Sequence, residues 1–108
     1  MGRSIQYETL TEKSELKRIG AKPHKNSGRG MKKADGTLDN FIVDVKEYSK
    51  SFSVSQDVWA KIVTDTIRVD PNKSPVIMLV LGETKKVRLA IIEWSEFEHL
   101  KEKAENNE

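Results

Sequence analysis

The chain has 108 residues, of which 36% are hydrophobic and 33% are charged, and its formal net charge is +2. This length supports one modest hydrophobic core, so we expect a single domain over residues 1–108, with a frayed tail from about residue 104. The chain has no cysteine, which excludes disulfides, thiolate zinc sites and a cysteine nucleophile. Its two histidines are too few for a histidine-rich metal site, so a bound metal would be held mainly by oxygen, as Mg²⁺ or Mn²⁺ prefers.

No apolar run reaches the length of a membrane span, and the N-terminus lacks the apolar core of a signal peptide. We therefore expect a cytoplasmic protein, in a bacterium or a phage-infected cell, without a membrane partner. The charges are unevenly distributed, because seven basic residues and no acid lie between Lys17 and Lys33. This basic block predicts either an anionic partner on one face or a solvated surface, and charge alone does not decide between them.

In chain order, the first predicted element is a helix over Glu8–Ile19, with Thr9 and Glu12 as a capping box. Gly20 is expected to end this helix. Residues 21–36 are polar and contain four of the Gly and Pro residues, so they predict one or two short strands around a flexible Ser27–Gly30 loop. A strand is predicted over Phe41–Lys46 after the Asp39-Asn40 turn.

A second helix is predicted from Ser53 or Ser55 to about Ile67. The apolar segment 75–81 is typical of a buried central strand, and after the 82–85 turn a further strand is expected over 87–94. Ser95 is predicted to cap a short final helix that ends near Lys103. This order of elements predicts an α/β fold, in which a mixed central sheet is flanked by helices.

The pattern that bears on chemistry is Asp44 and Lys46, which leave the same face of a strand. Alone, this pattern is a weak signal, and a surface ion pair on an edge strand is the favoured interpretation. Asp35 lies nine positions earlier across the expected hairpin, and strand pairing could bring it beside Asp44. Glu12 is on the apolar side of the first helix. Two or three carboxylates and a lysine suit a hard cation with one positive group directed at a phosphate or a water molecule.

Three segments together resemble a known family: Ser27-Gly28-Arg29-Gly30, Lys33-Ala34-Asp35 and Phe41-Ile42-Val43-Asp44-Val45-Lys46. They look like the core of PD-(D/E)XK restriction-endonuclease-like nucleases, especially the small Holliday junction resolvases and their phage relatives. The likeness covers roughly Glu12 to Ile67. The chain departs from the family pattern at Ala34, where a proline is usual, and at Asp44, where resolvases more often have Glu.

The resemblance implies roles for individual residues. Asp35, Asp44 and the carbonyl of Val45 would be metal ligands, and Lys46 would orient the attacking water and stabilise charge on the phosphate. Glu12 would complete the metal shell, although Glu15 and then Glu8 are alternatives on the same helix. DNA contacts are expected from the loop region and the second helix, at Lys25, Ser27, Arg29, Lys32, Lys33 and Lys61.

The implied activity is Mg²⁺-dependent hydrolysis of DNA phosphodiester bonds, with a 5′ phosphate on the product. Branched DNA such as a four-way junction would be the substrate, and a homodimer would supply one active site per strand. Two alternatives stay open. One is another nuclease of the same fold, for nicking, repair or restriction, and the other is a non-catalytic nucleic-acid-binding module. A binding module has no use for carboxylates that face DNA phosphates, because like charges repel.

Overall fold

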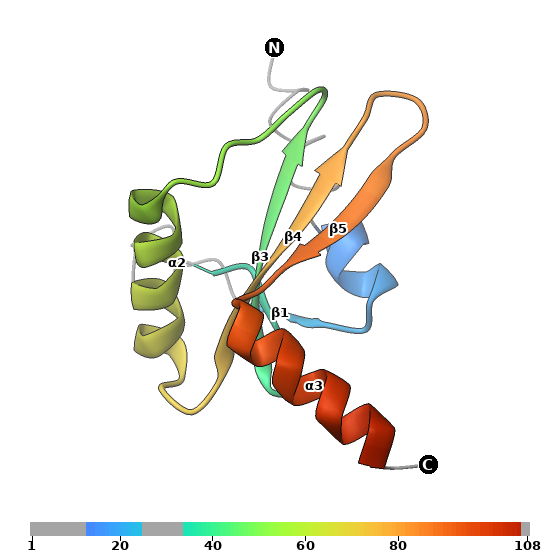
Figure 1. Cartoon of the computed structure of the whole chain (residues 1–108). Helices are drawn as coiled ribbons and strands as arrows, with labels where there is room; N and C mark the ends of the chain where they lie inside the picture. Colours follow the sequence, from blue (N-terminus) through green and yellow to red (C-terminus); the bar gives the residue numbers. More distant parts are fainter. Residues whose placement is uncertain (1–12, 25–33, 107–108) are drawn as a thin grey trace.

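The structure, a computed structural model, describes residues 13–24 and 34–106 (Figure 1). The predicted start of the N-terminal helix at Glu8 and the predicted Ser27–Gly30 loop lie outside the described residues. Residues 13–18 are helical. Gly20 then adopts a positive φ of 77°, and the Ala21 N–H donates to the Leu16 carbonyl at 2.9 Å. The prediction that Gly20 ends this helix is therefore confirmed.

Within the described part of the chain, the sheet has five strands in the order β1-β2-β3-β4-β5. They are β1 (Lys22–Pro23), β2 (Gly36–Leu38), β3 (Phe41–Tyr48), β4 (Ser74–Leu81) and β5 (Val87–Ile91). Strands β3 and β4 are parallel, and the other neighbours are antiparallel. The predicted α/β fold with a mixed sheet is confirmed at this level.

Helix α2 (Gln56–Val69) connects the two parallel strands β3 and β4. It begins where the sequence predicts, because the Ser55 hydroxyl accepts a hydrogen bond from the Val58 N–H at 3.1 Å. This bond satisfies one of the amide groups that the first turn of a helix leaves without an internal partner. Of the two predicted caps, the structure selects Ser55 over Ser53.

Replacing Ser55 by alanine should lower the free energy of unfolding by about 1 kcal/mol, because the first turn of α2 loses its side-chain acceptor. Ser53→Ala is the matched control, since Ser53 is exposed and precedes the cap. Urea denaturation followed by circular dichroism measures both changes. Equal destabilisation by the two substitutions would contradict the assignment of the cap.

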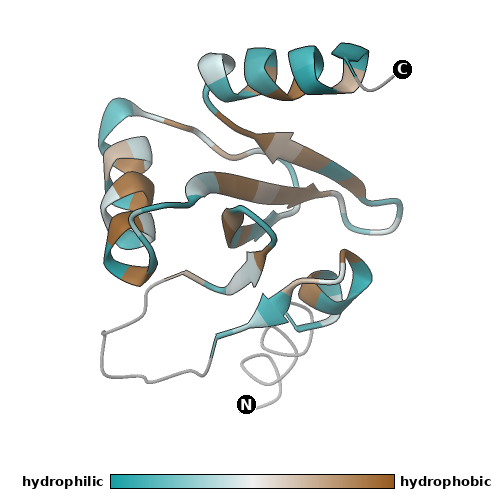
Figure 2. Cartoon of the chain, turned by 90° about the horizontal axis from the view of Figure 1, so that it is seen from below, coloured by the Kyte–Doolittle hydropathy of each residue, from teal (hydrophilic) through white to brown (hydrophobic). Residues whose placement is uncertain are grey.

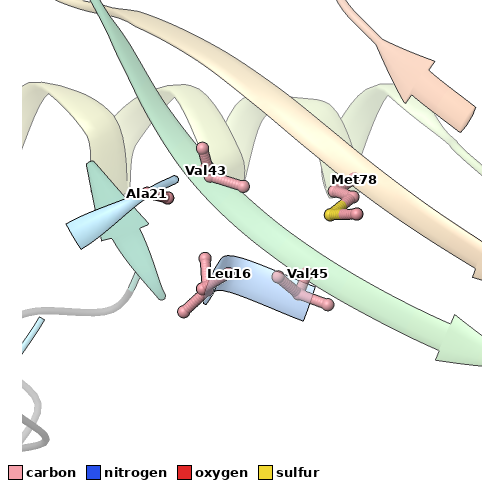
Figure 3. Close-up of a cluster of buried hydrophobic side chains, with 5 residues drawn as sticks. All are labelled: Leu16, Ala21, Val43, Val45 and Met78. Carbon is pink, nitrogen blue, oxygen red and sulfur yellow. The ribbon is translucent and has the colours of Figure 1, made fainter. Parts of the chain in front are cut away.

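The sheet separates two hydrophobic cores, because α2 and the helical segment 13–18 lie on opposite sides of it (Figure 1). On the first side, the buried cluster joins the N-terminal segment to β3 and β4 and consists of Leu16, Ala21, Val43, Val45 and Met78 (Figure 3). On the second side, Ile62 of α2 packs against Ile77 and Leu79 of β4. In Figure 2, hydrophobic residues accordingly recur along the strands and along α2.

The C-terminal region differs from the sequence prediction in its boundaries. Strand β5 ends at Ile91 rather than near Trp94, and helix α3 (Trp94–Asn106) starts before the predicted cap and continues past Lys103. The Glu93 carbonyl accepts hydrogen bonds from the N–H groups of Glu96 and Phe97, so Ser95 lies in the first turn and is not the cap. No helix in residues 13–24 and 34–106 is long and apolar enough to cross a membrane.

Candidate active site

Asp44 and Lys46 lie on the face of β3 that is covered by α2. The strand alternates, so Val43 and Val45 belong to the core on the other face. Asp44 is buried, and one of its carboxylate oxygens, Oδ1, lies 3.3 Å from Nζ of Lys46. The Lys46 side chain is 31% exposed, so it borders solvent while its ammonium group contacts the buried carboxylate. The predicted pairing of these two residues on one face is confirmed.

Asp35 lies just before β2 and is joined to β3 by both main-chain and side-chain hydrogen bonds. Its N–H donates to the Val43 carbonyl at 2.9 Å, and its carboxylate Oδ2 accepts from the Val45 N–H at 2.7 Å. Gly36, the first residue of β2, pairs with Val43, and just before it the Asp35 carboxylate continues the pairing by accepting the Val45 N–H of β3. The Asp35 carboxylate is thereby held beside the main chain that links Asp44 to Lys46.

The same hydrogen bond indicates where the carbonyl of Val45 points. The N–H and C=O groups of one strand residue are directed to the same neighbouring strand. Because the Val45 N–H reaches Asp35, the Val45 carbonyl leaves β3 on the Asp35 side. The Val45 carbonyl, predicted as a ligand, is therefore directed to the same side of β3 as the Asp35 carboxylate.

A second carboxylate–lysine pair, Asp65 with Lys61, lies on α2 and was not predicted as part of the site. Asp65 is only 4% exposed, and its Oδ2 lies 3.1 Å from Nζ of Lys61. Asp65 and Lys61 both act electrostatically on Asp44, which places the two pairs in one charge cluster. The signal was present in the sequence, because Asp65 falls on the same helical period as Val58 and Ile62.

Burial raises the pKa of the Asp44 carboxyl, and this effect outweighs the opposing attraction of Lys46 and Lys61. The nearby Asp65 carboxylate raises this pKa further. The ionised form of Asp44 is therefore less favourable in the folded chain than in water. Such a carboxylate gains from a positively charged partner, whether a metal ion or a protonated amine.

Asp44→Asn should consequently stabilise the fold at neutral pH in EDTA. A folded-state pKa above the usual 3.8 means that the wild-type chain loses stability as pH rises through that pKa. The asparagine variant lacks this loss. Its higher stability relative to the wild-type chain should therefore disappear below about pH 3.8, where the Asp44 carboxyl of the wild-type chain is also neutral. Thermal unfolding from pH 3 to 7 measures the difference, with exposed Asp57→Asn as control. A less stable Asp44→Asn at pH 7 would contradict the inferred cost of burial.

Several predicted site residues fall outside the described residues. These are Glu12, the preferred third carboxylate, its alternative Glu8, and the DNA-binding candidates Lys25, Ser27, Arg29, Lys32 and Lys33. Lys61 is described. Its side chain is 70% exposed, so its ammonium group lies between Asp65 and solvent.

The other alternative, Glu15, is separated from Asp44 by the sheet. Its carboxylate accepts hydrogen bonds from Nε and Nη2 of Arg88 at 2.7 and 3.0 Å. Arg88 pairs with Val80 on β4. Because Leu16, next to Glu15, packs on Val43 and Val45, this ion pair belongs to the face opposite Asp44. Glu15 is therefore wrong as the third carboxylate.

The donor types present suit a hard cation such as Mg²⁺. Asp35 and Asp44 offer carboxylate oxygens, Val45 offers a carbonyl oxygen, and no sulfur or imidazole competes at these positions. Among the residues that the structure describes, no three His, Cys, Asp or Glu side chains form a group that could hold a metal ion. A complete carboxylate shell would need a contribution from elsewhere, and Glu12 is the predicted source.

Comparison of the chain with protein-family models, with curated proteins and with solved structures found no match.

Proposed function

We propose that the chain is a metal-dependent DNA endonuclease whose site is formed by Asp35, Asp44 and Lys46. The observation that carries the proposal is the hydrogen bond from the Val45 N–H to the Asp35 carboxylate. It joins a carboxylate from one segment to a strand that carries a second carboxylate and a lysine. The arrangement supports the proposal because it gathers two carboxylates and one lysine around a single segment of β3.

Each group has a defined task in phosphodiester hydrolysis. Asp35, Asp44 and the Val45 carbonyl would hold Mg²⁺, which when bound polarises the scissile phosphate and makes its water more acidic. Lys46 would donate hydrogen bonds to the phosphate or to the attacking water, and would stabilise the charge that develops on the phosphate oxygens. Its partly exposed ammonium group can reach a bound substrate without leaving the neighbourhood of Asp44.

For the substrate, we infer branched DNA, with the four-way junction as the preferred form. This part of the proposal rests on the resemblance to junction resolvases. The test is incubation with a four-way junction, a nicked duplex and a linear duplex of the same sequence, in Mg²⁺, Mn²⁺ or EDTA. Metal-dependent cleavage of the junction that leaves 5′ phosphates would support it. Equal cleavage of all three would favour another nuclease of this type, and binding without cleavage would favour a non-catalytic module.

The basic residues Lys25, Arg29, Lys32 and Lys33 are expected to contact DNA phosphates. Neutralising two of them should weaken binding to all DNA sequences alike and reduce the salt slope of log K by roughly 0.9 per lost contact. Gel-shift titrations at several salt concentrations measure both quantities, and Lys85→Ala, in the exposed β4–β5 turn, is the control. Unchanged affinity and slope would mean that the DNA path lies elsewhere.

A further inference from the structure

Helix α3 exposes an apolar stripe that is not buried by residues 13–24 or 34–106. Phe97, Leu100 and Ala104 follow the i, i+3, i+7 spacing of one helix face, and Trp94 contacts Phe97 in a tilted ring pair with centroids 5.0 Å apart. Although the structure describes α3 in full, none of its residues is buried. Trp94 is 70% exposed, Phe97 44% and Leu100 39%. An amphipathic helix normally buries such a face, and adjoining exposed aromatic and aliphatic side chains typically mark an interaction site.

The stripe continues into an apolar groove on the sheet. This groove has a volume of about 350 Å³, and its lining includes Phe41, Val76, Ala90, Ile92 and Leu100. Leu100 belongs to both the groove and the stripe, so the two form one surface. Figure 1 shows α3 extending from the end of β5 toward the C-terminus at the edge of the molecule, and in Figure 2 hydrophobic segments recur between polar ones along it. A partner could therefore lie along α3 and cover the groove.

The charges beside the stripe indicate what this partner is. Glu96 and Lys103 lie along one edge of the stripe, while Trp94 and Lys101 lie along the other. If a second α3 packs antiparallel on the first, knobs-into-holes geometry brings Glu96 of one copy opposite Lys103 of the other. The two-fold axis repeats this contact, and on the other edge it brings Trp94 opposite Lys101, a pairing suited to a cation–π contact. The α3 surface is thus self-complementary both in the spacing of its apolar residues and in the positions of its charges.

We propose that α3 forms a homodimer interface by antiparallel packing on α3 of a second copy of this chain, with the apolar groove covered in the dimer. This inference rests on side chains of α3 and the groove and not on Asp35, Asp44 or Lys46, so it does not depend on the proposed nuclease activity. It would place two copies of the candidate site in one particle. Sedimentation equilibrium of the full chain should give a dimer, with twice the 12.3 kDa chain mass.

Charge reversal at the edge of the stripe provides the sharp test. Lys103→Glu would set glutamates against each other at both symmetric contacts, and Glu96→Lys would do the same with lysines. Each variant alone should weaken dimerisation about tenfold or more. An equimolar mixture of the two should restore a dimer, because the mixed dimer keeps one original Glu96–Lys103 contact and its other contact joins the introduced glutamate to the introduced lysine. Glu102→Lys, on the opposite side of α3, is the matched control.

Circular dichroism of each variant checks that the fold is retained, which matters most for Glu96 because it accepts a hydrogen bond from the Ser74 hydroxyl. Lys103→Glu carries the test by itself if Glu96→Lys does not fold. A wild-type chain that is monomeric at all concentrations would overturn the proposal. So would a dimer whose dissociation constant is the same in Lys103→Glu as in Glu102→Lys. Neither result depends on whether DNA is cleaved, so failure of the interface and failure of the nuclease proposal are separable.

Discussion

Lys46→Ala should lower the rate of metal-dependent DNA cleavage by roughly 10²–10⁴-fold, the range typical for loss of a positioned acid, base or charge-stabilising group. The physical reason is the position of its ammonium group, 3.3 Å from the buried Asp44 carboxylate on a side chain that is 31% exposed. No other described lysine is paired with Asp44. Alanine removes the charge and leaves the strand intact, because the Lys46 side chain is partly exposed.

Asp44→Asn should reduce cleavage at least as much, because a neutral amide is a poor ligand for Mg²⁺. In EDTA the same variant should bind DNA as well as the wild-type chain or more tightly, since a negative charge near the phosphates is removed. Single-turnover cleavage and gel shifts on the same preparation measure the two effects, with Asp57→Asn and Lys85→Ala as controls. Near wild-type cleavage by Asp44→Asn would contradict its role as a ligand, even if Lys46→Ala were inactive.

Elements with strong local signals were predicted well. Ser55 lies one position before a helix whose apolar period is clear, and the segment 75–81 is so apolar that a buried strand is the natural interpretation. The end of β5 was predicted too late, near residue 94, because a run of apolar residues continues through Ile92 although the chain leaves the sheet after Ile91. The start of α3 was likewise predicted too late, with Ser95 as its cap. The helix start there is set by the Glu93 carbonyl, which no sequence pattern reveals.

The residues of the candidate site also divide into those that a local sequence pattern predicts and those that it does not. Asp44 and Lys46 follow from strand alternation, and the approach of Asp35 follows from the short hairpin. Asp65 could have been found, since a carboxylate on the core side of a helix is costly and calls for an explanation. The position of Glu15 could not have been predicted from the sequence, because its partner Arg88 is 73 residues away along the chain. Only the register of β5 on β4 brings that guanidinium to the face opposite Asp44.

The Glu15–Arg88 ion pair should therefore affect stability and leave the chemistry unchanged. Glu15 is 3% exposed, and two hydrogen bonds from Arg88 hold the pKa of its carboxyl below the usual range. Arg88→Met leaves this buried carboxylate with Arg18 as the nearest described ion-pair partner, at 3.3 Å. We expect one of the largest losses of thermal stability for a single substitution in this chain, moderated by Arg18 and by solvent around the partly exposed Arg88.

Replacing both members of the pair distinguishes burial of an unpaired charge from a loss of packing. The double variant Glu15→Met and Arg88→Met should recover most of the stability that Arg88→Met loses, because buried ion pairs exchanged for apolar side chains are often neutral. The pH dependence gives a second check. With its pKa lowered by Arg88, Glu15 stabilises the wild-type fold above the unfolded-state pKa of about 4.5, and this contribution disappears as pH falls through the lower folded-state value. The double variant should lack that part of the acid destabilisation, as measured by thermal unfolding between pH 2 and 7. If it instead cleaved DNA much more slowly per folded molecule than the wild-type chain, Glu15 would belong to the catalytic site after all.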